Sequence, residues 1–146
     1  MAREILTPAD VRRVLEDART IAVLGAHPDT SRPAGYVPVY LASVGYRVLP
    51  VNPRLPGAQL LGQPVRSTLR ELVEPVDLVD VFRRAEDLLG HLEDLLAMPY
   101  RPRLVWLQSG IRNDAFAARL IAEGIDLVQD RCTYADHRAM GLPPRS

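Results

Sequence analysis

The stretch TIAVLGAHPDTSR, from Thr20 to Arg32, decides the fold of this chain. It begins with a short apolar strand pattern that contains two β-branched side chains and ends abruptly at Gly25. A polar loop follows, and then a helical pattern. This order is typical of a buried parallel strand whose carboxyl end opens onto a phosphate-binding turn. A glycine there lets the backbone turn sharply, and the following helix offers free N–H groups and the positive end of its dipole to an anion.

Length and composition limit the classes of protein to which this chain can belong. The 146 residues predict a single domain over 1–146, with ends at 1–6 and 142–146 that we expect to fray. No apolar run is long enough to cross a bilayer, and no signal-peptide pattern begins the chain. The single cysteine, Cys132, fits a reducing compartment, so we expect a cytoplasmic protein. A formal net charge of zero argues against general binding to nucleic acid.

All 18 basic residues of the chain are arginines. The absence of lysine from the sequence excludes a Schiff-base lysine and a P-loop lysine. A phosphate group would therefore have to be held by arginine side chains, backbone N–H groups or hydroxyls.

The rest of the chain alternates between strand and helix patterns. Apolar runs predict strands over 20–24, 46–51, 76–82, 104–107 and 125–128. Helical spacing predicts helices over 8–18, 34–44, 85–97, 113–123 and 134–140, and a short helix capped by Ser67. Strands this apolar have no face for water. The sequence thus predicts an α/β fold: a Rossmann-like, doubly wound, five-stranded parallel sheet in the order 3-2-1-4-5, with helices on both faces.

Ligands of such sheets bind beyond the carboxyl ends of the strands, where the strand order reverses. With the predicted order, this crevice lies between strands one and four. The segments that follow the five strands are 25–32, 52–54, 82–84, 108–112 and 130–132. Because each contains glycine, arginine or an amide, together they predict a ligand site.

The residues that follow the first two predicted strands limit which nucleotide ligands are expected. The dinucleotide fingerprint G-x-G-x-x-G is incomplete after Gly25, and strand two is followed by Asn52 and Arg54 rather than by the Asp or Glu that binds an NAD ribose. Asn and Arg would accept a phosphorylated ribose. This favours NADP or coenzyme A, with Arg32 and Arg54 as phosphate partners.

A set of short motifs carries a family resemblance over residues 20–141: Gly25-Ala26, Ser31-Arg32-Pro33, Tyr36, Tyr40-Leu41, Gly45-Tyr46-Arg47-Val48, Pro50-Val51-Asn52-Pro53, Val81-Phe82-Arg83, Val105-Trp106-Leu107-Gln108-Ser109-Gly110-Ile111 and Asp130-Arg131-Cys132. The chain resembles the small bacterial CoA-binding protein family, which is similar to the N-terminal, CoA-binding domain of the succinyl-CoA synthetase alpha subunit. His27 stands where many relatives carry Ser. The sequence has no second domain with a phosphohistidine, so the synthetase reaction is not expected.

The resemblance implies coenzyme A as the ligand and assigns residues to its parts. The pyrophosphate and 3′-phosphate would face Gly25, Ala26, His27, Ser31 and Arg32. The adenosine end would be lined by Val51, Asn52 and Pro53. Near the CoA phosphates, Arg54 or Arg32 would replace a lysine that the synthetase domain uses. The adenine or the pantetheine arm would be flanked by Phe82 and Arg83, and the arm would be bordered by Gln108, Ser109, Gly110 and Ile111. Tyr36 belongs to the same set.

The sequence therefore predicts a non-catalytic protein that binds coenzyme A or an acyl-CoA, with no catalytic residue and no metal ligand. Two alternatives stay open. One is an NADP-dependent oxidoreductase. The other is a thiol or redox protein that uses Cys132, with its pKa lowered by Arg131 or His137. The expected partner is a small molecule, not nucleic acid or a membrane; a homodimer or an unknown protein partner is left open.

Overall fold

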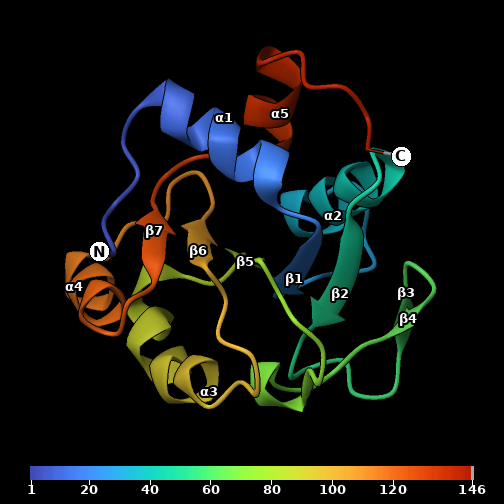
Figure 1. Cartoon of the computed structure of the whole chain (residues 1–146). Coiled ribbons are helices and arrows are strands. Elements are labelled where there is room, and N and C mark those ends of the chain that lie inside the picture. Colours follow the sequence, from blue (N-terminus) through green and yellow to red (C-terminus); the bar gives the residue numbers. More distant parts are fainter. Residues whose placement is uncertain (146) are drawn as a thin grey trace.

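The computed structural model describes residues 1–145 and contains one parallel sheet. Its strands are β1 (Thr20–Leu24), β2 (Arg47–Val51), β5 (Leu78–Val81), β6 (Leu104–Leu107) and β7 (Asp126–Val128), in the order β2-β1-β5-β6-β7 (Figure 1). A separate antiparallel pair, β3 (Gln59–Leu60) and β4 (Gln63–Pro64), forms a small hairpin beside the β2 edge. The predicted α/β, Rossmann-like, doubly wound parallel sheet is confirmed.

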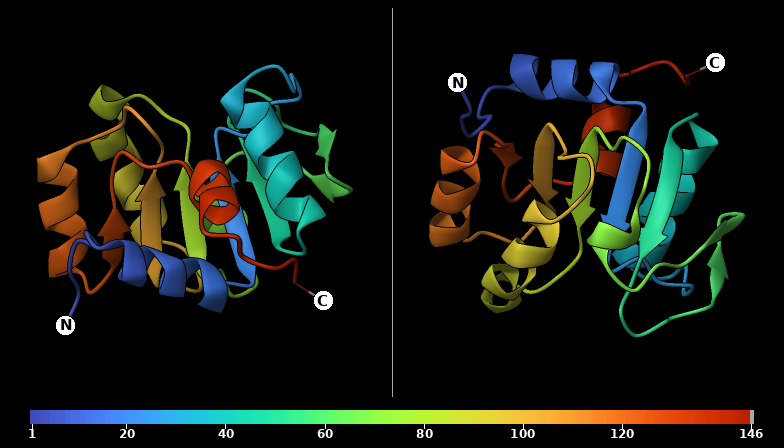
Figure 2. Two further views of the ribbon diagram at one scale, coloured as in Figure 1. Left: turned by 90° about the horizontal axis from the view of Figure 1, so that it is seen from above. Right: turned by 60° about the horizontal axis from the view of Figure 1, so that its bottom comes forward.

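Helices cover both faces of the sheet (Figure 2). One layer contains α1 (Pro8–Asp17), α2 (Pro33–Ser43) and α5 (Thr133–Ala139). The other contains the 3-10 helices η1 (Leu69–Glu71) and η2 (Ala85–His91), together with α3 (Leu92–Leu96) and α4 (Asp114–Ala122). Successive strand side chains point to opposite layers: Ile21 and Val23 join the first core, whereas Ala22 and Leu24 join the second. This alternation explains why every strand is apolar throughout.

The predicted strand order 3-2-1-4-5 is wrong. The third long strand, β5, pairs with β1 and not with β2, so the five main strands follow the order 2-1-3-4-5. The connection from β2 to β5 buries Leu69 and Leu72 on the face opposite α2. A right-handed crossover on that face carries the chain back across β1, which makes β5 the neighbour of β1. The reversal of strand order therefore lies between β1 and β5, not between strands one and four.

Helix ends follow local chemistry where the sequence carries clear capping residues. Thr7 accepts a hydrogen bond from the Asp10 N–H, and Asn113 accepts one from the Phe116 N–H, as expected of N-caps. The predicted Ser67 cap is wrong. The Asp94 carboxylate, from α3, instead accepts hydrogen bonds from the backbone N–H groups of Leu69 and Arg70.

The predicted helix 85–97 divides into two parts. Its first part is the 3-10 helix η2, and the α-helical part begins only at Leu92. Gly90 lies just before the change, and glycine is a poor former of α-helix.

Residues near both ends, for which we expected fraying, contact the rest of the fold. The Ile5 N–H donates to the Leu127 carbonyl at 2.7 Å, and the Ile5 side chain is buried. The Arg145 N–H donates to the Val44 carbonyl at 2.7 Å. Within residues 1–145, no helix has both the length and the apolar character needed to cross a membrane.

Candidate functional site

The turn after β1 requires glycine at its first position. Gly25 has a φ of +94°, and a Cβ added there would lie 2.7 Å from the carbonyl oxygen of Phe82, directly after β5. The Gly25 N–H donates to the Val51 carbonyl at the end of β2, at 2.7 Å. The turn therefore lies in close contact with the ends of both strands that flank β1, at the point where the strand order reverses.

The loop from His27 to Gly35 is held by short-range hydrogen bonds. The Ser31 N–H and hydroxyl both donate to Asp29 Oδ1, at 2.9 and 2.7 Å, and these bonds hold the pKa of Asp29 below its usual value. The Asp29 N–H donates to His27 Nδ1 at 3.0 Å. In a neutral imidazole the proton is then on Nε2, so the Arg32 guanidinium 3.1 Å away finds no acceptor there. Arg32 is consequently available to another acceptor.

The N-terminus of α2 carries no competing group. Its N-cap, Arg32, makes no side-chain capping bond, and the first turn contains no acidic residue. The N–H groups of Gly35 and Tyr36 bond to the Arg32 carbonyl, each at 2.9 Å. The positive end of the helix dipole and the Arg32 side chain thus act at the same place.

The residues after β2 have a structural role in part. Asn52 is buried; its Nδ2 donates to the Ala26 carbonyl and its Oδ1 accepts from the Arg54 N–H, both at 2.9 Å. Asn52 therefore ties the β2 end to the turn after β1. The Val51 side chain lies in the core, whereas Pro53 and Arg54 are exposed.

A cavity of about 750 Å³ lies at the carboxyl edge of the sheet. Its walls come from the start of α2, the segments after β5 and β6, and the start of α5. The predicted site residues that line it are Arg32, Tyr36, Phe82, Arg83, Gln108, Ser109, Gly110 and Ile111. Ala26 and His27 line a separate pocket of about 140 Å³. Gly25, Ser31, Val51, Asn52, Pro53 and Arg54 line neither.

Two arginines of the cavity are not neutralised by carboxylates. Among residues 1–145, neither Arg32 nor Arg83 forms an ion pair. Arg83 Nε instead donates to His91 Nε2 at 3.3 Å, and burial lowers the pKa of His91, which favours the neutral, accepting ring. Arg84 differs, since it pairs with Glu86 and Asp87 at 3.3 and 3.2 Å. Arg32 and Arg83 thus give the cavity an excess of positive charge.

The sequence did not predict the contribution of α5 to the cavity. Tyr134 and Ala135 line it, and the Tyr134 ring packs edge-on against Tyr36 with 5.6 Å between ring centroids. The signal in the sequence was limited to Cys132, which follows a strand and also lines the cavity. No local sequence pattern in α5 indicates that this helix packs beside α2.

The structure contradicts the proposed activation of Cys132. Burial raises the pKa of this thiol. Arg131 is paired with Asp136 at 2.7 and 2.9 Å, and buried His137 is hydrogen-bonded to the Tyr40 hydroxyl at 2.6 Å. Neither group lowers the pKa of the thiol. The described part of the chain contains no group of three or more His, Cys, Asp or Glu side chains that could hold a metal ion.

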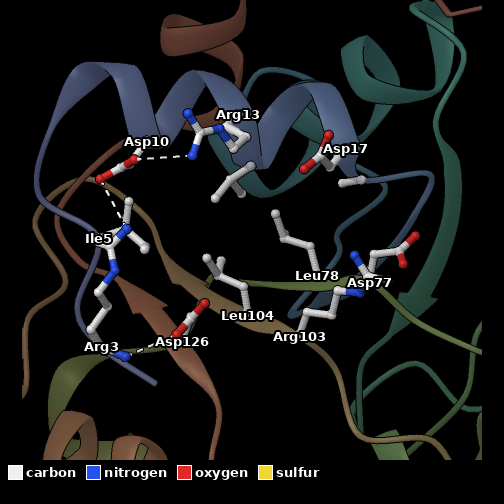
Figure 3. Close-up of a pocket in the computed structure, with 12 residues that line it drawn as sticks. Arg3, Ile5, Asp10, Arg13, Asp17, Asp77, Leu78, Arg103, Leu104 and Asp126 are labelled. Atoms are coloured by element: carbon white, nitrogen blue, oxygen red, sulfur yellow. Dashed lines mark hydrogen bonds and ion pairs between the residues drawn. The ribbon is translucent and has the colours of Figure 1, made fainter. Parts of the chain in front are cut away.

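A second pocket, of about 210 Å³, lies at the opposite edge of the sheet, between α1 and the beginnings of the strands (Figure 3). Arg3 Nη2 and Arg13 Nη1 approach the two oxygens of Asp10 at 3.1 and 3.9 Å. The Arg3 N–H donates to Asp126 Oδ1 at 2.9 Å. Ile5, Leu78 and Leu104 lie on its inner side. Here Asp10 pairs with both Arg3 and Arg13.

Fold and cavity together place the chain in the class of Rossmann-like α/β domains with a ligand-sized cavity at the switch point. More narrowly, the chain belongs to the CoA binding domain family, whose model matches residues 19–138. This confirms the family resemblance.

Known relatives are similar to this chain in sequence or structure over nearly its whole length. The uncharacterized protein YneT of Bacillus subtilis (strain 168) is 32% identical over 129 residues, which is 88% of this chain and 93% of the relative. The solved structure of cell-free ID.343 from Thermus thermophilus is 51% identical, with a TM-score of 0.87 over 92% of this chain and 99% of that one. A hypothetical protein from Pyrococcus horikoshii OT3 is 28% identical, with a TM-score of 0.83 over 92% of each chain.

Proposed function

We propose that this protein binds coenzyme A or an acyl-CoA at the carboxyl edge of its sheet, without catalysing a reaction on it. The observation that carries the proposal is the cavity of about 750 Å³ at the switch point, where Arg32 and Arg83 have no carboxylate partner within residues 1–145. The family to which the chain belongs supports coenzyme A as the ligand. The volume is in the range of cavities that enclose small organic ligands.

The phosphates would lie at the start of α2. An arginine makes paired, charge-assisted hydrogen bonds to phosphate oxygens, and the helix N-terminus there has neither a side-chain cap nor an acidic residue. Arg32, the N-cap of α2, would be one phosphate partner, and Arg54, exposed after β2, would be a second. His27, Ser31 and the Gly25–Ala26 backbone would shape the turn rather than neutralise charge, because Ser31 and His27 already bond within the loop.

The pantetheine arm would extend into the cavity. Phe82, Ile111 and the Tyr36–Tyr134 pair offer apolar and aromatic surface, while Gln108 and Ser109 offer polar groups. A binding role without catalysis is supported by Cys132, since burial raises the pKa of the cysteine thiol that lines the cavity and so disfavours the nucleophilic thiolate.

The test is calorimetric titration of the purified protein with CoA, 3′-dephospho-CoA, NADP and NAD in parallel. We expect CoA to bind most tightly and 3′-dephospho-CoA more weakly, because Arg32 and Arg54 would contact the 3′-phosphate. Tight binding of NADP without binding of CoA would contradict the proposal and favour an oxidoreductase. Equal affinity for CoA and 3′-dephospho-CoA would contradict the assignment of the 3′-phosphate.

A further inference from the structure

A fully buried carboxyl group lies beneath the cavity. Asp80, in β5, has no exposed surface and stands between Val23 of β1 and Trp106 of β6 in the sheet register. Within residues 1–145 no cation bonds to it. Its hydrogen bonds come from Gln108 Nε2 at 2.5 Å and from the Thr133 hydroxyl at 2.9 Å. Burying a carboxylate without a cation is costly, and burial raises the pKa of Asp80 to about 7.

The hydrogen bonds to Asp80 fix the orientation of the Gln108 amide. Gln108 Nε2 donates to both Asp80 Oδ1 and the Thr133 hydroxyl oxygen, the latter at 3.0 Å, and these two bonds use both amide protons. An ionised carboxylate can only accept, so the amide nitrogen and not its oxygen must face Asp80. The assignment of nitrogen and oxygen in this amide therefore follows from the chemistry of its neighbours.

The remaining polar atom of Gln108 is its amide oxygen. Gln108 lines the cavity, and no protein group in the described chain donates to Oε1. No wholly buried side-chain oxygen or nitrogen lacks a hydrogen-bond partner among residues 1–145. Oε1 is thus not enclosed in the protein; it reaches the cavity as an acceptor held in one direction.

We propose that Asp80 and Thr133 position the Gln108 amide so that its oxygen accepts a hydrogen bond from an N–H group of the ligand in the cavity. The inference rests on the proposed function, under which the donor is a secondary amide of the pantetheine arm. Asp80 is then a positioning residue that acts through Gln108. An amide-bearing arm is recognised, whereas a ligand without N–H donors at this place gains nothing from it.

The arrangement also makes the cavity wall sensitive to pH. A protonated Asp80 can donate to the Gln108 oxygen, which turns the amide and presents its N–H groups to the ligand instead. The other charged or titratable side chains that line the cavity or lie on α5 are Arg32, Tyr36, Arg83, Arg84, Glu86, Cys132, Tyr134, Asp136, His137 and Arg138; Arg131, just before α5, pairs with Asp136. All of them are retained in an Asp80→Asn variant, so comparison with that variant isolates Asp80.

The first experiment needs no ligand. The side-chain amide of Gln108, assigned by its disappearance in Gln108→Met, is followed by ¹H–¹⁵N NMR between pH 5 and 9. We expect its shift to titrate with a midpoint near 7 in the unmodified protein and to be independent of pH in Asp80→Asn. A Gln108 signal that does not titrate, or that titrates alike in both proteins, overturns the positioning role.

The second experiment compares CoA with adenosine 3′,5′-bisphosphate, which lacks the arm. We expect Gln108→Met to weaken CoA binding about tenfold, as loss of one hydrogen bond to the ligand would, and to leave binding of the bisphosphate unchanged. Gln63→Met, in the β3–β4 hairpin, is the matched control with unchanged affinities. CoA bound equally by Gln108→Met and the unmodified protein overturns the inference while the proposed function stands.

The pH dependence of affinity separates Asp80 from the ligand's own titration. We expect CoA affinity to fall about tenfold from pH 8 to pH 6 in the unmodified protein, relative to Asp80→Asn. Ionisation of the 3′-phosphate affects both proteins alike. Identical pH profiles overturn the role of Asp80. Unmodified protein that binds no CoA overturns both the proposed function and the ligand assignment, and the NMR titration then decides the positioning role alone.

Discussion

Arginine side chains lie at both edges of the parallel sheet, but they have different roles at the two edges. At the amino edge, beside a pocket of about 210 Å³, Arg3 and Arg13 both approach the carboxylate of Asp10 (Figure 3). At the carboxyl edge, Arg32 and Arg83 surround a larger cavity and, among residues 1–145, meet no carboxylate. Charge that is paired within the fold stabilises the fold, whereas charge left unpaired is available to a ligand.

The same contrast extends to two aspartates, one just before β5 and one within it. Asp77, just before β5, accepts two backbone N–H groups, from Arg19 and Thr20, each at 2.9 Å. Asp80, within the strand, is buried, and no cation of the described chain bonds to it. One aspartate joins the beginnings of two strands; the other costs stability and orients a side chain in the cavity. The following predictions test whether the carboxyl edge trades stability for function in this way.

The largest expected effect is the pH dependence of stability that Asp80 confers. Its pKa is raised to about 7 in the folded protein from the usual 3.8, so between these values the folded state holds a proton that the unfolded state lacks. Stability should therefore fall as the pH rises from 4 to 7, by about 1.4 kcal/mol per pH unit, and then level off. Asp80→Asn should remove this slope. Urea unfolding at several pH values measures it, and parallel curves for both proteins would contradict the prediction.

The next effect concerns the close packing of the loop that leads into α2. A Cβ at Gly35 would lie 2.0 Å from the Asp29 carbonyl oxygen, which belongs to backbone and cannot move aside. We expect Gly35→Ala to lower the free energy of unfolding by about 3 kcal/mol. Gly90→Ala is the matched control, because a Cβ there meets nothing within 4 Å. The measurement is denaturant unfolding of both variants. Equal free energies of unfolding would show that the loop rearranges to accommodate the added Cβ at low cost.

The sequence predicted the layers of this fold and missed its strand order. Alternation of apolar strands with helices fixes a parallel sheet, because strands such as β1 bury both faces. The order depends on the face across which the segment from β2 to β5 returns. That segment contains the β3–β4 hairpin and the short 3-10 helix η1, and the burial of Leu69 and Leu72 on that face arises from tertiary packing. The periodicity of the sequence therefore does not indicate on which face this segment packs.

The candidate site was predicted in the same uneven way. Segments that follow strands, such as 82–84 and 108–112, lie at the carboxyl edge whatever the strand order, and Phe82 and Gln108 line the cavity there. Asn52 was predicted in the same way, but it does not line the cavity and its amide bonds to the backbone within the fold. Tyr134 was missed, since its position depends on how α5 packs beside α2.

A smaller effect separates the arginines of the two edges. Arg32→Ala should weaken the affinity for CoA about 10- to 100-fold, because one charge-assisted phosphate contact contributes about 1.5–3 kcal/mol to binding. The loss should be smaller for 3′-dephospho-CoA if Arg32 contacts the 3′-phosphate. Arg13→Ala, at the amino edge, is the matched control and should leave CoA affinity unchanged. Equal losses of CoA affinity from both substitutions would mean that long-range charge, rather than the site, governs binding.

The smallest effect belongs to the amino edge alone. Thr7 caps α1 there, with its hydroxyl oxygen accepting from the Asp10 N–H at 3.2 Å. Thr7→Ala should lower stability by about 1 kcal/mol. Thr7→Ser retains the oxygen and should lose less than half of that. Both variants should bind CoA as the unmodified protein does, as measured by calorimetry at a temperature where each is folded. A loss of affinity in Thr7→Ala with stability unchanged would link the two edges, and the separation of a stabilising edge from a binding edge would then be wrong.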